Sequence, residues 1–201
     1  MTPTKYSMSF TTGALFFSES LKLTELYISA NQWNDVRIAV ISGNIIQSRT
    51  VNTLKRVTNE IISRLRTLRE QEIKFLSEAD YTEQGYLLWL AVCRRYAFIA
   101  DFAVEIVHGN FASLKSSVTH EEYNIFFNKK AEWHAELDRI APSTKNKIRQ
   151  TLFRMMQEAH LLDKNDVIIP IVPSAAFRAI LAGAMPREAM FFPISELARS
   201  A

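Results

Sequence analysis

The feature that most constrains this fold is a segment from residue 83 to residue 107 that is apolar almost all round. Its length approaches that of a membrane span, but Arg94, Arg95 and Asp101 would then lie near the bilayer centre. Each would cost roughly 2.5–3.5 kcal/mol, which about cancels the gain from the surrounding apolar side chains. A helix that is apolar all round is otherwise a buried one. The segment therefore predicts one long central helix of a helical bundle, and no membrane span.

Charges inside such a helix need partners or a route to water. Asp101 lies about two turns from Arg94, too far for a direct pair along one helix. We therefore expect a buried ion pair for at least one of Arg94 and Arg95, with Glu83, Glu105 or an acid of the C-terminal part as partner. A ligand site is the alternative interpretation.

Composition favours helices over other folds. The chain has only 5 Gly and 6 Pro in 201 residues, too few for a Gly-rich nucleotide-binding fold or for the many turns of an all-β domain. Its single cysteine, Cys93, cannot form an intramolecular disulfide, which suits a reducing compartment. The N-terminus lacks the apolar run of a signal peptide. We expect a mainly α, cytoplasmic protein.

Two domains are predicted. Apolar residues at helical spacing run through the N-terminal part, where Ser48 or Thr50 caps a long amphipathic helix. A stretch rich in Ser and Thr follows residue 112, which is typical of a hinge or boundary. We therefore predict an N-terminal helical bundle at residues 1–112 and a second domain at residues 113–201.

The second domain has the element order of a winged helix-turn-helix. Thr119 and Glu122 form a capping-box pattern for its first helix, a second helix follows, and Ser143 is expected to cap a third. Residues 167–172 are then a β-branched run after a turn, and Pro170 confines it to an edge or a two-stranded ribbon. The sequence thus predicts a winged-helix-like unit with a short β-hairpin.

The third helix of that domain, residues 143–157, is a candidate recognition helix. Its first turns carry residue types that pair with base edges and phosphates, at the helix end whose dipole favours phosphate. A solvated surface helix, or a winged helix that contacts protein, is the alternative. The candidate DNA-binding residues here are Lys145, Asn146, Lys147, Arg149 and Gln150.

A second candidate surface is the basic helix of the N-terminal bundle. It contains Glu60 as its only acid before Glu70, so its positive charge is locally unbalanced. Such a stripe could follow a phosphate backbone. The alternative is that these cations pair with acids elsewhere or only solvate the helix. The candidate residues are Arg49, Lys55, Arg56, Arg64 and Arg66.

Catalytic patterns are missing. The four histidines fall on different elements without a second ligand at zinc spacing, and Cys93 has no histidine near it in sequence. The chain carries no phosphate-binding Gly-rich loop and no nucleophile elbow. We expect no catalytic residues, no metal, no cofactor and no small-molecule substrate, hence a protein that is not an enzyme.

Several long, aromatic-rich strings resemble the BrxA family, the small helical proteins of bacteriophage exclusion (BREX) defence systems. The resemblance covers most of the chain. It is carried by residues 5–13 (KYSMSFTTG), 19–27 (ESLKLTELY), 87–96 (LLWLAVCRRY), 101–105 (DFAVE), 126–134 (FFNKKAEWH) and 144–156 (TKNKIRQTLFRMM).

The resemblance implies a cytoplasmic phage-defence protein without a catalytic centre, associated with DNA and working beside a methyltransferase, an ATPase and other BREX proteins. Together with the basic helices it predicts a component that binds double-stranded DNA mainly through phosphates. The alternative is an adaptor that docks onto other BREX components. The resemblance assigns no role to residues 182–201.

Overall fold

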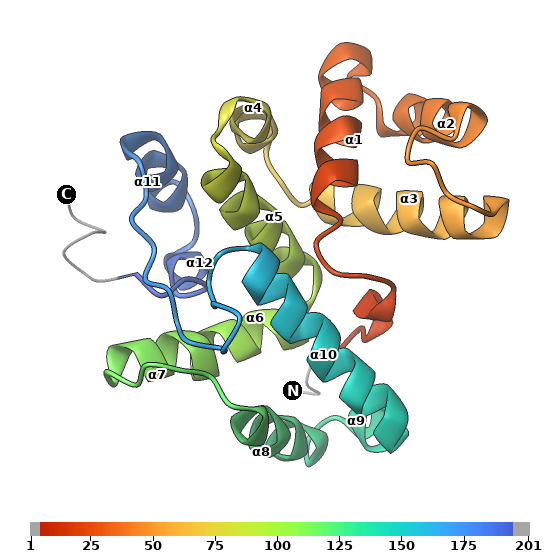
Figure 1. Ribbon diagram of the computed structural model, residues 1–201. Helices are drawn as coiled ribbons and strands as arrows, with labels where there is room; N and C mark the ends of the chain where they lie inside the picture. Colours follow the sequence, from red (N-terminus) through yellow and green to blue (C-terminus); the bar gives the residue numbers. More distant parts are fainter. Residues whose placement is uncertain (1–4, 195–201) are drawn as a thin grey trace. The chain divides into compact units, whose positions relative to one another are not determined.

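The computed structural model describes residues 5–194, and their regular structure is almost entirely helical (Figure 1). The mainly α fold class is therefore confirmed. The chain packs as two compact units, the α1–α5 unit (Leu15–Arg95) and the α6–α12 unit (Met1–Ala14 with Tyr96–Ala201). The predicted boundary between residues 112 and 113 lies inside the α6–α12 unit, and as a limit of independent folding it stays a prediction.

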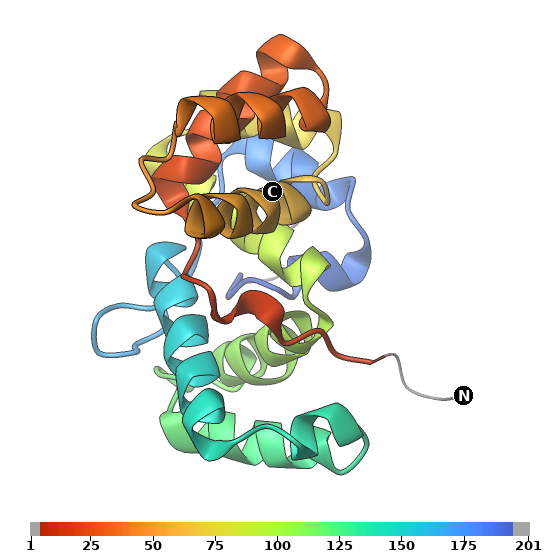
Figure 2. The same ribbon diagram turned by 90° about the vertical axis from the view of Figure 1, so that its right-hand side faces the viewer.

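The α1–α5 unit is a helical bundle. Helix α1 packs against α2, α3 and α4, and α5 packs against α3 and α4. Figure 2 shows α2 and α3 side by side. The helices are α1 (Phe17–Ala30), α2 (Trp33–Gly43), α3 (Val51–Leu65), α4 (Glu70–Glu78) and α5 (Tyr81–Arg95).

Helix α3 is the strongly amphipathic helix that the sequence predicts. Its N-cap is Thr50, whose hydroxyl accepts a hydrogen bond from the Thr53 N–H at 3.2 Å, as expected. Asn44, in the left-handed conformation, is the C-cap of the preceding helix α2. The buried face of α3 is made of Leu54, Val57, Thr58, Ile61, Ile62, Arg64 and Leu65.

The predicted buried ion pair is confirmed at Arg94, with a partner outside the candidates. Its two Nη atoms donate to the carboxylate of Glu72 on α4, at 2.5 and 2.9 Å. Arg94 also donates to the Thr67 carbonyl at 3.0 Å, and the Glu72 side chain is fully buried. Burial by itself favours the neutral acid, but hydrogen bonds from Arg94 and the Arg69 backbone hold the pKa of Glu72 below its ordinary value.

The central apolar segment is not one helix, and that prediction is wrong. It divides at Tyr96, which is extended (φ −126°, ψ 99°) and fully buried, between α5 and α6. Beyond the break, α6 continues through a π-helical segment into α7, so the three form one rod in Figure 1. Neither Gly nor Pro marks this break in the sequence.

The α6–α12 unit holds the remaining helices. Helices α8, α9 and α10 follow in the order expected for the C-terminal part, and the N-terminal 3₁₀ turn packs against α10. The elements are the 3₁₀ turn Ser9–Thr11, α6 (Ala97–Phe102), the π segment (Ala103–His108), α7 (Gly109–Ala112), α8 (His120–Ala131), α9 (Ala135–Asp138), α10 (Pro142–Glu158), α11 (Ala175–Ala182) and α12 (Pro186–Ala189).

A polar network holds the N-terminal arm onto this unit. The Tyr6 hydroxyl donates to Asp101 at 2.5 Å, and Lys130 on α8 donates to the same carboxylate at 3.2 Å. The Tyr6 ring stacks on His134 with centroids 4.0 Å apart. Burial raises the pKa of Asp101, but its bonds from Tyr6 and Lys130 outweigh that and lower it. Asp101 is thus satisfied within its own unit.

The predicted β-hairpin does not form within the described residues, so the wing is a wrong expectation. Residues 161–172 make only two isolated antiparallel bridges, Ser117 with Val167 and Leu162 with Ile168. The reason is that the run changes partner along its length: the Ile169 N–H bonds to Leu161, whereas the Ile171 N–H bonds to Pro193. Pro170, between them, has no N–H to continue a ladder.

Helix boundaries are predicted in part. The capping box of α8 is present, with Thr119 accepting from the Glu122 N–H and the Glu122 carboxylate accepting from the Thr119 N–H. Ser143 does not cap α10, because that helix begins at Pro142 with Ala141 as N-cap. Proline at the first helical position loses no hydrogen bond there. In the part of the chain from residue 5 to residue 194, no helix has the length and apolar character needed to cross a membrane.

Replacing Glu72 tests the buried pair. Glu72→Gln leaves Arg94 buried beside a neutral group and should lower the free energy of unfolding by about 3–5 kcal/mol in urea titrations at pH 7. The exposed Glu70→Gln on the same helix is the control and should change the free energy of unfolding by less than about 0.5 kcal/mol.

The same pair predicts a dependence of stability on pH. Because the pKa of Glu72 is lowered in the folded protein, the stabilisation by Glu72 is present above its ordinary pKa of 4.5 and is lost as the pH falls through the folded pKa. The wild type should therefore lose more stability than Glu72→Gln between pH 5 and pH 3. Equal losses would contradict the pair.

Candidate nucleic-acid interface

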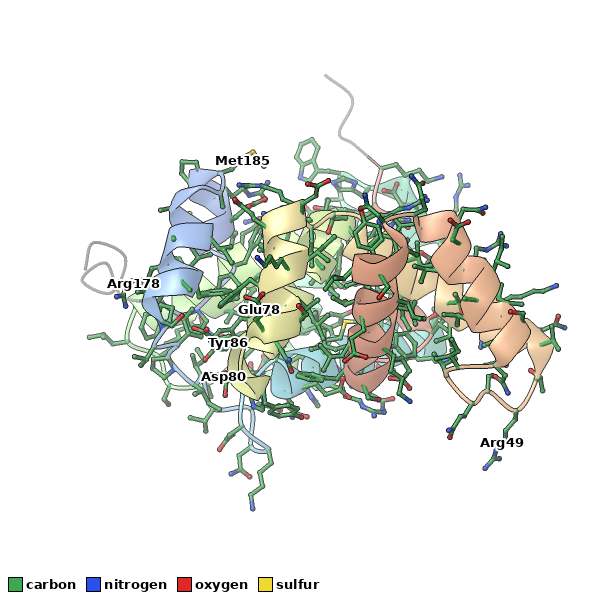
Figure 3. The ribbon with its side chains drawn as sticks, turned by 90° about the horizontal axis from the view of Figure 1, so that it is seen from above. Arg49, Glu78, Asp80, Tyr86, Arg178 and Met185 are labelled. Carbon is green, nitrogen blue, oxygen red and sulfur yellow. The ribbon has the colours of Figure 1, made fainter. Side chains whose placement is uncertain are left out.

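Four of the five cations predicted around α3 are exposed. Arg49 precedes the helix, and Figure 3 shows its side chain directed away from the ribbon. Lys55 and Arg56 lie on the exposed face of α3, and Arg66 lies at its C-terminal end. Within residues 5–194 none of these four side chains has an ion-pair or hydrogen-bond partner. The sequence alternative in which they pair with acids therefore does not apply to these four.

Arg64, the fifth cation of this set, is buried. Its Nε donates to Glu60 at 2.8 Å, and its guanidinium lies 5.4 Å from the ring centroid of Phe16. The side chain is only 4% exposed, so it contributes to the interior of the unit. The sequence alone does not separate Arg64 from its neighbours, because the packing of the other helices decides whether a cation beside the buried face is covered.

A polar groove of about 340 Å³ runs between α2 and α3. Arg37 crosses it, and its Nε donates to Asn59 Oδ1 at 2.8 Å. This leaves the terminal nitrogens of Arg37 and the Nδ2 of Asn59 as donors. Among the described residues, the lining of the groove contains no acidic side chain and consists of Trp33, Asn34, Arg37, Asn59, Ile62, Ser63 and Arg66. Arginine and amide donors without a carboxylate are the groups that bind phosphate oxygens.

Arg37 and Asn59 are therefore residues of this groove that the sequence reasoning missed, and it also missed Asn52, which is exposed on α3. Arg37 lies on the short helix α2, which carries no run of charge. Asn52 and Asn59 are uncharged, so a search for basic clusters passes over them. A usable signal was present, because the two asparagines are seven residues apart on a helix whose buried face was already identified.

The candidate residues of α10 divide into two groups. Lys145 lies against α8, where its Nζ donates to Asn128 Oδ1 at 2.7 Å and lies 4.5 Å from the Phe127 ring centroid. Arg149 contacts the same helix, with Nη1 at 3.5 Å from Asn124 Oδ1. Partial burial, and secondarily the charge of Arg149, lower the pKa of Lys145.

Asn146, Lys147 and Gln150 of α10 are exposed. Of the predicted α10 set, these three are available to a ligand, and Lys147 is the only cation among them. The predicted α10 set thus presents one exposed cation, whereas the predicted α3 set presents four. The two sets belong to different units, α3 to the α1–α5 unit and α10 to the α6–α12 unit.

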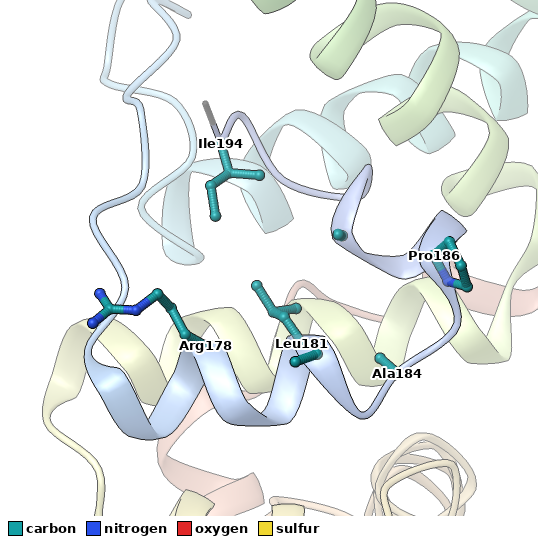
Figure 4. A pocket seen from close by; sticks show the side chains of 7 residues that line it. Arg178, Leu181, Ala184, Pro186 and Ile194 are labelled. Atoms are coloured by element: carbon teal, nitrogen blue, oxygen red, sulfur yellow. The ribbon is translucent and has the colours of Figure 1, made fainter. Parts of the chain in front are cut away.

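Other candidate sites for chemistry are few in the described chain. Residues 5–194 contain no group of three His, Cys, Asp or Glu side chains that could hold a metal ion. Cys93 is buried in α5. An apolar pocket of about 280 Å³ lies between α11 and α12, where Leu181 and Ile194 point toward one another (Figure 4). Of the lining residues that the structure describes, Arg178 alone is charged, and its Nη1 donates to the Pro173 carbonyl at 2.9 Å.

The sequence matches the family model described as BrxA over residues 4–184. It is 26% identical to the BREX protein BrxA of Escherichia coli O9:H4 (strain HS) over 151 residues, covering 75% of this chain and 71% of that protein. It is 22% identical to the BREX protein BrxA of Bacillus cereus (strain H3081.97) over 157 residues, covering 78% of each.

The fold also resembles a crystal structure of an uncharacterized protein from Magnetospirillum magneticum. The TM-score is 0.79 at 14% identity, and the match covers 94% of this chain and 98% of that one. At this identity the likeness concerns the fold alone.

Proposed function

This chain belongs to the BrxA family of BREX phage-defence systems, and on that premise we propose that it is the DNA-binding, non-enzymatic component of such a system in the cytoplasm. Its ligand is double-stranded DNA, held mainly through phosphates. Family membership implies other BREX proteins as further partners. The observation that carries the proposal is the exposed, unpaired positive charge around α3, at Arg49, Lys55, Arg56 and Arg66.

Free cations fit a phosphate backbone better than they fit a structural role. A cation that stabilises the fold would be paired or partly buried, as Arg64 is with Glu60. The four exposed cations stay hydrated, so the fold incurs no desolvation penalty for them, and they can displace the counterions condensed on DNA. Arg37 and Arg66 add donors on the two sides of the groove between α2 and α3.

Salt titration of DNA binding tests this function. The full chain should bind duplex DNA in fluorescence polarisation, with an affinity that falls steeply as salt rises. The triple variant Arg49→Ala/Lys55→Ala/Arg66→Ala removes three phosphate contacts, so the slope of log K against log salt should decrease in magnitude by about 2.7. The matched control Lys22→Ala/Lys74→Ala/Lys164→Ala removes the same charge from exposed positions elsewhere. Absence of binding at low salt, or equal slopes for both variants, would contradict the proposal.

A second candidate function, a protein-interaction adaptor, is favoured by exposed apolar side chains in the α6–α12 unit. Leu114, Val172 and Trp133 are 93%, 87% and 74% exposed. Apolar surface left in water is typical of contact sites when it is contiguous, whereas single exposed residues are common. An adaptor would bind protein and a DNA-binding component would bind nucleic acid, so a binding assay with nuclease treatment separates the two functions.

The adaptor function predicts that purified BREX components retain this chain after nuclease treatment. Trp133→Ser should then weaken retention, because it removes a large apolar contact, and should leave DNA affinity unchanged. Lys129→Ser, at the end of the preceding helix α8, is the control, since it removes an exposed charged side chain instead of an aromatic one. The measurement is pull-down with nuclease present. Loss of the complex on nuclease treatment would count against an adaptor and for DNA as the link.

A further inference from the structure

The exposed face of α3 is polar but not uniformly charged. Six of its residues, taken at about 100° per residue, fall within one arc of about 100° around the helix axis. They extend over about 21 Å at 1.5 Å per residue. No acid lies on this arc, since Glu60 points to its pair with Arg64. The six residues, which we call the α3 polar face, are the exposed Asn52, Lys55, Arg56 and Asn59, the partly buried Ser63, and Arg66 at the C-cap.

Two residues of this face are of types that pair with base edges. Asn52 and Arg56 lie in the N-terminal half, one turn apart, and both are exposed. A carboxamide can pair with the N6 and N7 of adenine, and a guanidinium with the O6 and N7 of guanine. Beside them Val51 is 61% exposed, an apolar side chain able to contact a thymine methyl group. Amides also bind phosphates, but an exposed valine offers nothing to a phosphate, so Val51 is the residue that a surface for phosphates alone would not need.

Further cations lie at both ends of α3 and on the helix beside it. Arg49 lies in the preceding loop, Arg66 at the far end, and Arg37 on the neighbouring helix α2. The major groove of B-DNA is about 12 Å wide, so a helix seated in it brings residues about 21 Å apart near the phosphates of both strands. The arrangement of flanking cations therefore fits insertion of α3 into that groove, with α2 beside the backbone.

One of the amides is already oriented. The Arg37 Nε donates to Asn59 Oδ1 at 2.8 Å, which engages the oxygen of this amide and leaves its Nδ2 as a donor. Fixing a side chain before binding reduces the entropy lost on binding. By contrast, Lys145 and Arg149 of α10 are engaged with α8, which leaves that helix fewer groups for base edges.

We infer that α3 is a sequence-reading recognition helix, which places Asn52 and Arg56 on base edges in the major groove of duplex DNA while Arg37, Arg49 and Arg66 hold phosphates. The inference rests on the proposed DNA binding and goes beyond it, because it requires a preferred base sequence. It also assigns the reading to α3 and not to α10.

Selection from a randomised duplex library tests the inference on the full chain. The wild type should enrich a short motif, and binding of that motif and of a scrambled duplex is then measured for each variant. Asn52→Ala and Arg56→Ala should each lose about 5- to 100-fold of the preference for the motif. Arg49→Ala should weaken motif and scrambled duplex by the same factor. All three positions are exposed, so unfolding curves should superimpose on the wild type.

The outcomes separate this inference from the proposed function. DNA binding without an enriched motif overturns sequence reading but leaves the DNA-binding function standing. Enrichment of a motif whose preference survives both Asn52→Ala and Arg56→Ala assigns the reading elsewhere and also overturns it. Absence of DNA binding overturns both. The expected result is an enriched motif that is lost on changing Asn52 or Arg56 and kept on changing Arg49.

Discussion

The buried face of α3 determines what the rest of its surface can do. Leu54, Ile61 and Leu65 are at most 3% exposed, and their contact with the bundle fixes the rotation of the helix about its axis. At 3.6 residues per turn that single rotation sends Asn52, Arg56 and Asn59 outward together and turns Arg64 in. The contacts that fix the helix are apolar, but they determine where the polar surface of α3 lies.

The helical class, the Thr50 cap and the α8 capping box could be predicted from sequence, because each depends on residues within one turn of each other. The break at Tyr96 and the missing hairpin could not. They depend on which distant backbone groups are available, such as the Pro193 carbonyl that accepts from Ile171. The same holds for Arg94, whose partner Glu72 is remote in sequence and lies on another helix. Side-chain exposure is likewise a tertiary property, so the sequence predicts the same DNA-binding role for the buried Arg64 as for the exposed Arg66.

Family membership and local geometry carry different parts of the account. The match over residues 4–184 places the chain in a phage-defence family, whereas nothing in a family name identifies which helix contacts a ligand. The geometry supplies that second part. Cations without partners around α3, and amides between them, suit a polyanion that also offers base edges. On α10 the partial use of Lys145 and Arg149 against α8 reduces what remains for a ligand.

The most direct test of this account is a two-dimensional ¹H–¹⁵N NMR titration of the full chain with duplex DNA. It follows the backbone amides of α3 and the side-chain amides of Asn52 and Asn59. The account predicts that the largest shifts cluster from Arg49 to Arg66, and that both asparagine side chains move with the same saturation curve. Binding that shifts α10 while leaving α3 and its asparagines unchanged would contradict it.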